Sequence, residues 1–99
     1  MAELPKPIGR RPVLLVTRTA SIGVRTAVTV APITRTIRGI RTEVPLGRSH
    51  GLPTSSVADC DSLQTIPKAA LRPRRVGRLA VNDLPDLDRA LRYALGIRT

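Results

Sequence analysis

The sequence predicts one mainly β domain, residues 1–99, in which about five short strands form a twisted sheet or partly open barrel with a C-terminal helix packed on it. Three observations predict this fold. Short runs rich in Val, Leu and Thr recur through the first two thirds of the chain, several of them with a period of two. Gly and Pro separate these runs at short intervals. Near the C-terminus the apolar spacing changes to three and four residues, as in a helix.

The first two strands are expected to form an antiparallel pair. Residues 12–18 (PVLLVTR) are a compact apolar run, which is typical of a mostly buried strand. In residues 24–34 (VRTAVTVAPIT), Val and Thr alternate with Arg, Ala and Thr, which indicates a second strand. The intervening residues 19–23 are few enough for an antiparallel connection. Pro32 has no amide hydrogen and is expected to interrupt the ladder just before Thr34.

The middle of the chain is expected to supply three further strands. After a basic loop with Gly39 at its turn, residues 41–46 alternate as a third strand, and Pro45 indicates that this strand lies at an edge. A fourth strand is expected through residues 57–63. A short fifth strand is expected over residues 75–80.

The expected helix covers about residues 83–95. Four leucines at spacings of three, four and four form one apolar stripe there. Asn82 is expected to be the N-cap, and Asp residues crowd the positive end of the helix dipole. Gly96 stands where the helix should end.

The charge of the chain favours an anionic partner, nucleic acid first. The formal net charge is +10, and all of the basic residues except Lys6 and Lys68 are Arg. The planar guanidinium group matches phosphate oxygens two at a time. The alternative is that the Arg content reflects the base bias of a genome, because charge bears on partners and not on fold. A hydrophobic fraction of 41% excludes a disordered basic tail.

Composition also excludes several classes of site. One Cys and one His cannot build a zinc site of the Cys-x-x-Cys kind, and a single thiol cannot form an internal disulfide. One His cannot supply two imidazoles as acid and base. No apolar run approaches the roughly 18–20 residues of a membrane helix, and residues 1–11 lack a signal-peptide core. The expected compartment is therefore the cytoplasm, with no membrane contact.

Cys60, His50 and the two neighbouring acids are expected to be structural. Asp59 and Asp61 flank Cys60, and their charge should raise the pKa of a buried or half-buried thiol. His50 lies in a polar loop bounded by Gly and Pro and is expected to be exposed. Two carboxylates at i and i+2 in a strand point to one face and could share a cation. No third carboxylate lies nearby in sequence, so no metal site and no cofactor are expected.

Arg and Thr at strand ends are the stronger candidates for chemistry. Arg10 and Arg11 stand at the start of the first strand, and Thr34 and Thr36 flank Arg35 at the end of the second. If these strands pair antiparallel, Arg11 lies near Thr34. The alternative is that these residues are ordinary solvated strand ends.

The same residues carry a resemblance to a known family. Five segments occur in order from about residue 9 to residue 95: RRPVLLVTR, TVAPITRTIRG, EVPLG, GLPTSSVADCDSLQTIP, and RVGRL before a helix. This ordered set resembles the MazF/PemK family of toxin endoribonucleases from toxin–antitoxin pairs. The resemblance implies a small SH3-like barrel of the MazF/PemK/CcdB type that dimerises and cuts single-stranded RNA sequence-specifically, without a metal.

The resemblance also implies a catalytic pair, Arg11 and Thr34. A 2′-hydroxyl of the RNA would attack its adjacent phosphate, leaving 2′,3′-cyclic phosphate and 5′-hydroxyl ends, and cleavage would inhibit translation and growth. Because a guanidinium keeps its proton at neutral pH, Arg11 is expected mainly to stabilise charge in the transition state, while Thr34 donates a hydrogen bond. The remaining candidates for RNA binding are Arg10, Arg35, Thr36, Arg38, Ser56, Asp61, Ser62, Gln64 and Thr65.

The implied partners are anionic. The resemblance implies a cognate antitoxin with an acidic segment that lies along the RNA groove, in a heterohexamer or larger assembly with the toxin homodimer. A charge of +10 suits that partner and single-stranded RNA. Because Tyr93 is the only aromatic residue, phosphate contacts rather than base stacking are expected to hold the RNA.

The N-terminus departs from the family pattern. Members usually begin with a strand of the type GDVW and a loop that helps to cover the active site, whereas here only MAELPKPIG precedes Arg10. Either the first strand is shortened, or the encoded start lies upstream of Met1. A second function also stays open, namely a non-catalytic toxin or nucleic-acid-binding module on the same barrel, for example of the gyrase-poisoning type.

Overall fold

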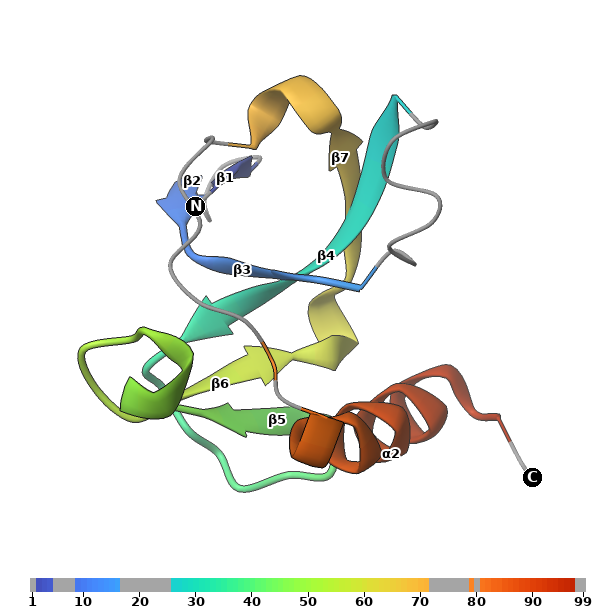
Figure 1. Cartoon of the computed structure of the whole chain (residues 1–99). Coiled ribbons are helices and arrows are strands. Elements are labelled where there is room, and N and C mark those ends of the chain that lie inside the picture. Colours follow the sequence, from blue (N-terminus) through green and yellow to red (C-terminus); the bar gives the residue numbers. More distant parts are fainter. Residues whose placement is uncertain (1, 5–8, 17–25, 72–78, 80, 98–99) are drawn as a thin grey trace.

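A curled antiparallel sheet and one helix make up the structure, a computed structural model that describes residues 2–4, 9–16, 26–71, 79 and 81–97, with the backbone alone at 2–4, 9–11 and 81. The mainly β fold with a C-terminal helix is as predicted (Figure 1). The strands are β1 (Ala2–Leu4), β2 (Gly9–Arg11), β3 (Val13–Leu15), β4 (Ala27–Thr34), β5 (Glu43–Leu46), β6 (Ser56–Asp59) and β7 (Gln64–Pro67). Short 3-10 helices are η1 (Arg48–His50), η2 (Cys60–Ser62), η3 (Lys68–Ala70) and η4 (Val81–Asp83), and the α-helix is α2 (Leu84–Leu95).

Strand β4 is the centre of the larger sheet. It pairs antiparallel with β3 along one edge, which confirms the first predicted pair. Along its other edge it pairs first with β7 and then with β6. Among the described strands, β5 pairs only with β6 and lies at the end of the strand order, so the edge position that Pro45 indicated is confirmed. Strands β1 and β2 form a separate antiparallel pair, and residues 19–23 lie outside the described residues.

Pro32 interrupts the ladder on one edge of β4 and not on the other, so the prediction is confirmed for one edge. The strand continues through it, with Val13 opposite. The Ile33 amide donates to the Pro12 carbonyl at 3.0 Å, so by alternation the amide position of Pro32 faces the opposite edge of β4. On that edge β7 pairs as far as Val30, and β6 pairs from Ile33 onward. The missing donor of proline thus falls where one partner strand gives way to the next.

Of the fourth strand expected over residues 57–63, only the part up to Asp59 is a strand. β6 ends at Asp59, the chain forms the 3-10 helix η2, and β7 follows as a strand that the sequence pattern did not reveal. The side chain of Asp59 caps η2 by accepting the Asp61 amide at 3.0 Å. Asp59 and Asp61 therefore do not share a strand, which corrects the expectation that both point to one face.

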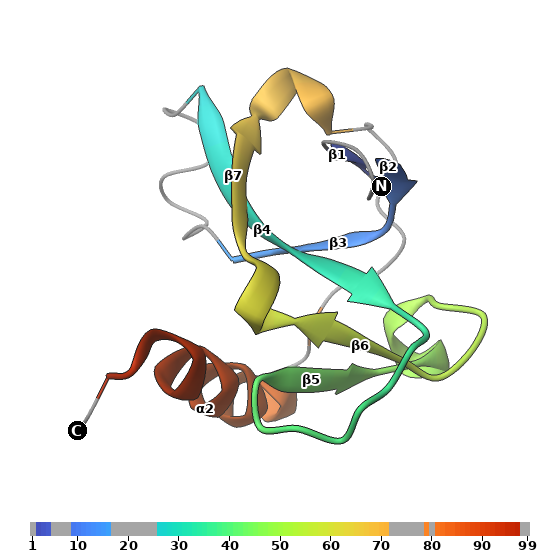
Figure 2. The same ribbon diagram turned by 180° about the vertical axis from the view of Figure 1, so that it is seen from behind.

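Strand β4 is buried on both of its faces. Alternate residues of a strand point to opposite faces, so Ala31 and Val30 belong to different clusters. Ala31 packs in the cluster that includes Ala90 of α2, and this helix lies along β5 in both views (Figure 1, Figure 2). Val28 and Val30 pack with Ile66 of β7 on the other face.

The helix ends where the sequence predicted, within one residue. Gly96 closes it in the left-handed conformation, at φ 70°, and its amide bonds to the carbonyls of the last turn. The N-cap is Asp83 rather than Asn82, because the short helix η4 runs directly into α2. Of the expected fifth strand over residues 75–80, only Leu79 is described, and it packs against the core. No helix in the described part of the chain is long and apolar enough to cross a membrane.

Candidate active site

A backbone hydrogen bond joins the residue after Arg11 to the residue before Thr34. Arg11 ends β2 and is followed by Pro12, whose carbonyl accepts the Ile33 amide at 3.0 Å. Thr34 follows Ile33 and ends β4. Antiparallel pairing continued by one residue would bring the backbone of Arg11 next to that of Thr34, which is the arrangement that the sequence predicts. The side chains of Arg10 and Arg11 are outside what the structure describes.

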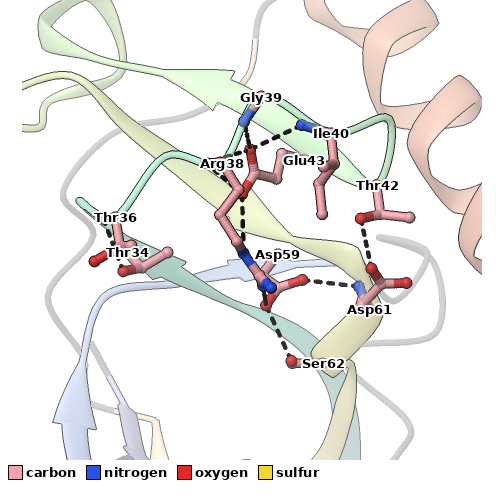
Figure 3. Close-up of polar contacts among 10 residues, drawn as sticks. All are labelled: Thr34, Thr36, Arg38, Gly39, Ile40, Thr42, Glu43, Asp59, Asp61 and Ser62. Carbon is pink, nitrogen blue, oxygen red and sulfur yellow. Dashed lines mark hydrogen bonds and ion pairs between the residues drawn. The ribbon is translucent and has the colours of Figure 1, made fainter.

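The Thr34 hydroxyl is held by the chain that follows it. Its Oγ1 accepts the Thr36 amide at 3.1 Å, and the residue is partly exposed (Figure 3). A hydroxyl has one hydrogen to donate besides its acceptor positions. Accepting the amide therefore fixes the oxygen and leaves the hydroxyl hydrogen available for an anionic ligand.

Residues 35–42, here called the β4–β5 loop, wrap around a buried carboxylate. The Glu43 side chain is 3% exposed. Its oxygens accept the amides of Arg38 at 3.2 Å, Gly39 at 2.9 Å and Ile40 at 3.4 Å. Gly39 adopts a left-handed conformation, φ 70°, which turns these successive amides toward one point. At the far end of the loop, the Arg41 guanidinium stacks over the exposed Tyr93 ring at 5.6 Å and links the loop to α2.

The Arg38 side chain bridges two carboxylates. Its Nε lies 3.9 Å from Glu43 Oε2, and its Nη2 lies 3.5 Å from Asp59 Oδ2 (Figure 3). Glu43 and Asp59 are directly opposite each other in the β5–β6 pair. Like charges in such a cross-strand position repel each other. Arg38 offsets this repulsion while its side chain stays 60% exposed.

The two neighbouring acids are engaged within the chain. Asp59 accepts the Ser62 hydroxyl at 3.0 Å in addition to the Asp61 amide. Asp61 is exposed and accepts the Thr42 hydroxyl at 2.6 Å. Among the residues that the structure describes, no three His, Cys, Asp or Glu side chains are placed to hold a metal ion.

The other predicted RNA-binding residues differ in how exposed they are. Arg35 and Thr36 are exposed directly after Thr34. Ser56 is buried and donates its hydroxyl to the Thr54 carbonyl at 3.1 Å, so it lies inside the fold and away from the surface that RNA can reach.

Two residues of β7 lie away from Thr34. Gln64 and Thr65 pair with Val30 and Thr29, about 13 Å or more from Thr34 along β4 at 3.3 Å per residue. The Thr65 hydroxyl also hydrogen-bonds that of Thr29 at 3.1 Å. The structure therefore gathers the candidates around the β4–β5 loop and η2, and leaves Gln64 and Thr65 further along the sheet.

Two residues of this region were missed as site residues. The sequence pattern placed Glu43 only in a strand, and it gave Asp59 either a structural role or a share in a cation pair. An acid at the start of an apolar strand, directly after a loop with a turn glycine, was the available signal for Glu43. No local signal joined it to Asp59, because that contact depends on the β5–β6 register.

Cys60 is a buried thiol, as predicted. It is 2% exposed, and its pKa is raised from 9.0 to about 11, first by burial and then by the charges of Asp59 and Asp61. The thiol stays protonated at neutral pH and is excluded as a thiolate nucleophile.

His50 is not exposed, contrary to the prediction. Its side chain is 15% exposed. Nδ1 accepts the Gly47 amide at 3.1 Å, so the ring hydrogen of the neutral imidazole is on Nε2, which lies 3.0 Å from Asp83 Oδ2. The imidazole thus joins the loop at η1 to the start of α2.

Comparison with known proteins places this arrangement among toxins. The model of the family described as PemK-like, MazF-like toxin of type II toxin-antitoxin system matches residues 2–95. Endoribonuclease MazF3 of Mycobacterium tuberculosis is 45% identical over 97 residues, which are 98% of this chain and 90% of that protein.

Solved structures agree with this match. The Mycobacterium tuberculosis toxin MazF-mt6 superposes with a TM-score of 0.93 at 41% identity, covering 100% of this chain and 96% of that one. An endoribonuclease from a mycobacterial species, solved in complex with its cognate antitoxin, superposes with a TM-score of 0.83 at 28% identity, covering 99% and 92%.

Proposed function

The chain belongs to the family of PemK-like, MazF-like toxins of type II toxin–antitoxin systems, and from that premise we propose that it is an endoribonuclease that cleaves single-stranded RNA sequence-specifically. Relatives named endoribonucleases support this activity. The observation that carries the proposal is the hydrogen bond between Ile33 and Pro12, because it joins the residue before Thr34 to the residue after Arg11.

The proposed reaction uses a nucleophile that the RNA itself supplies. The 2′-hydroxyl loses its proton and its oxygen attacks the adjacent phosphorus. The bond from phosphorus to the 5′-oxygen breaks, and that oxygen takes up a proton. The products are a 2′,3′-cyclic phosphate and a free 5′-hydroxyl. Because no hydroxide has to be generated from water, the reaction does not require a metal ion.

Arg11 and Thr34 are the proposed catalytic residues. Negative charge builds on the phosphate oxygens in the transition state, and a preorganised donor there is worth about 100-fold to 1,000-fold in rate. The Thr34 hydroxyl already has its oxygen fixed by the Thr36 amide at 3.1 Å. The Arg11 guanidinium supplies the positive charge.

Exposed Arg residues near Thr34 are the proposed phosphate-binding residues. Arg35 is exposed and Arg38 holds a 60% exposed side chain, within a chain of net charge +10. Phosphate contacts release counterions, so the affinity for RNA should fall steeply as salt rises. The same surface suits a cognate antitoxin with an acidic segment, bound to a toxin homodimer in the cytoplasm.

The test is cleavage of a defined single-stranded RNA by the purified protein in EDTA. We expect new 5′-hydroxyl ends and 2′,3′-cyclic phosphate ends, and a large loss of rate in Arg11→Ala. Intact RNA that stays tightly bound would instead support a non-catalytic nucleic-acid-binding module. Cleavage that appears only after a divalent cation is added would overturn the metal-independent reaction.

A further inference from the structure

We propose that Glu43 and Asp59 are positioning residues that hold the Arg38 guanidinium beside Thr34, so that Arg38 binds the RNA phosphate backbone next to the scissile bond. This inference rests on the proposed RNA cleavage and deepens it. It assigns a role to two buried carboxylates that the reaction at Arg11 and Thr34 does not use.

The sheet register places Asp59 close to Thr34. Thr34 of β4 is directly opposite Val57 of β6. Asp59 follows Val57 by two residues, so both side chains point to one face of the sheet. Thr34 and Asp59 are therefore diagonal neighbours, with backbones about 7–8 Å apart. Figure 3 shows Thr34 and the Arg38–Asp59 pair on the same side of the ribbon.

Two anchors fix the direction of the guanidinium. Nε lies toward Glu43 at 3.9 Å and Nη2 lies toward Asp59 at 3.5 Å, while the backbone amide of Arg38 also binds Glu43 at 3.2 Å. A guanidinium has five donor hydrogens in one plane, so donors remain for a phosphate after both carboxylates are engaged. A lysine has no planar fork and cannot hold this orientation.

A purely electrostatic role for Asp59 predicts the opposite effect of neutralising its charge. If Asp59 acted only through its charge, it would repel RNA, and its neutralisation would strengthen binding. If it acts by holding Arg38, neutralisation weakens cleavage although the net charge of the protein becomes more positive. One substitution therefore separates the two explanations.

The experiment is Asp59→Asn in the full-length protein, assayed by kcat/KM on a defined RNA. Asn keeps the shape and an oxygen that accepts the Asp61 amide. We expect a fall of about threefold to fivefold, the value of one partly exposed ion pair. Asp88→Asn on exposed α2 makes the same change of charge and should leave kcat/KM unchanged. Wild-type activity that persists undiminished in Asp59→Asn would overturn the positioning role while leaving the proposed function intact.

A double-mutant cycle identifies Arg38 as the group through which Asp59 acts. Arg38→Ala should reduce kcat/KM to a similar extent, and the double variant should fall no further. Arg38→Lys should not restore the activity, because it returns the charge without the fork. Additive losses would show that Asp59 acts independently of Arg38.

A measurement on the wild-type protein keeps the inference testable if a variant fails to fold or if RNA is not cleaved. The Nε–H signal of Arg38 should shift when a 2′-deoxy, uncleavable analogue of the RNA is added, and it should shift less in Asp59→Asn. A signal that the analogue does not move, or that moves equally in both proteins, would refute the positioning of Arg38. Absence of any cleavage by wild type, by contrast, would refute the proposed function.

Discussion

Raising the pH from about 8 to about 11 is expected to destabilise the fold through Cys60. The thiol is 2% exposed, and its pKa is raised from 9.0 to about 11, mainly by burial. Between these two values the folded chain keeps the thiol proton while the unfolded chain loses it. The unfolded state then binds fewer protons, so the free energy of unfolding decreases as the pH rises. Below the unfolded pKa, the contribution is fully present.

The magnitude follows from the size of the shift. A change from 9.0 to about 11 spans two pH units, and each unit is worth 1.36 kcal/mol, which gives about 2.7 kcal/mol at most. Urea unfolding of wild type and Cys60→Ala at fixed protein concentration measures it. Other groups that titrate in this range are common to both proteins and cancel in the difference. The small cavity in Cys60→Ala adds an offset that does not depend on pH.

The difference between the stability profiles of wild type and Cys60→Ala against pH tests the contribution of the thiol. Wild type should lose more stability than Cys60→Ala between about pH 9 and about pH 11. Parallel profiles would refute the reasoning, because they would mean that the thiol titrates alike in the folded and unfolded chains.

Three further outcomes are expected. His50→Ala removes the acceptor of the Gly47 amide and the contact to α2, so it should lower the free energy of unfolding by about 1–2 kcal/mol in urea, and an unchanged midpoint would contradict the bridging role. Thr34→Val keeps the branched shape but loses the hydroxyl, so single-turnover RNA cleavage should fall about 100-fold or more, whereas a nearly normal rate would remove Thr34 from the catalytic pair. Gly39→Ala should lower the free energy of unfolding by about 1–2 kcal/mol because Gly39 has a φ of 70°, although an added Cβ meets nothing within 4 Å. Gly39→Asn should lower it less in thermal or urea melts, and equal losses would argue against backbone strain.

Local patterns predicted the elements whose geometry they control. The period-two alternation around Val28 and Val30 predicted β4, and the leucine spacing predicted α2. They did not predict the 3-10 helix η2. This helix begins where the side chain of Asp59 caps it, and the apolar pattern gives no sign of such a cap. The local patterns predicted a break in the ladder at Pro32 but not the edge on which it falls, because that depends on which strand lies opposite.

Local patterns likewise predicted one part of the candidate site and missed another. The hydrogen bond between Pro12 and Ile33 follows from the antiparallel pairing of β3 with β4, which the strand patterns predicted. The nearness of Glu43 to Asp59 follows from the register of two strands separated by a loop, which no local pattern fixes. His50 was assigned to the surface because its partner, Asp83, lies 33 residues away in the sequence.

The central position of β4 bears on how proteins of this kind diversify. Thr34 ends a strand that is hydrogen-bonded to β3, β6 and β7, and a slip of one residue would turn its buried side chains outward and break all three pairings. The residues that follow, Arg35 to Ile37, are exposed and pair with none of the described strands. Under the proposed reaction, substitutions there change what an RNA meets beside Thr34 without displacing Thr34 itself. Target preference can therefore evolve separately from the chemistry of cleavage, since each depends on a different part of the same segment.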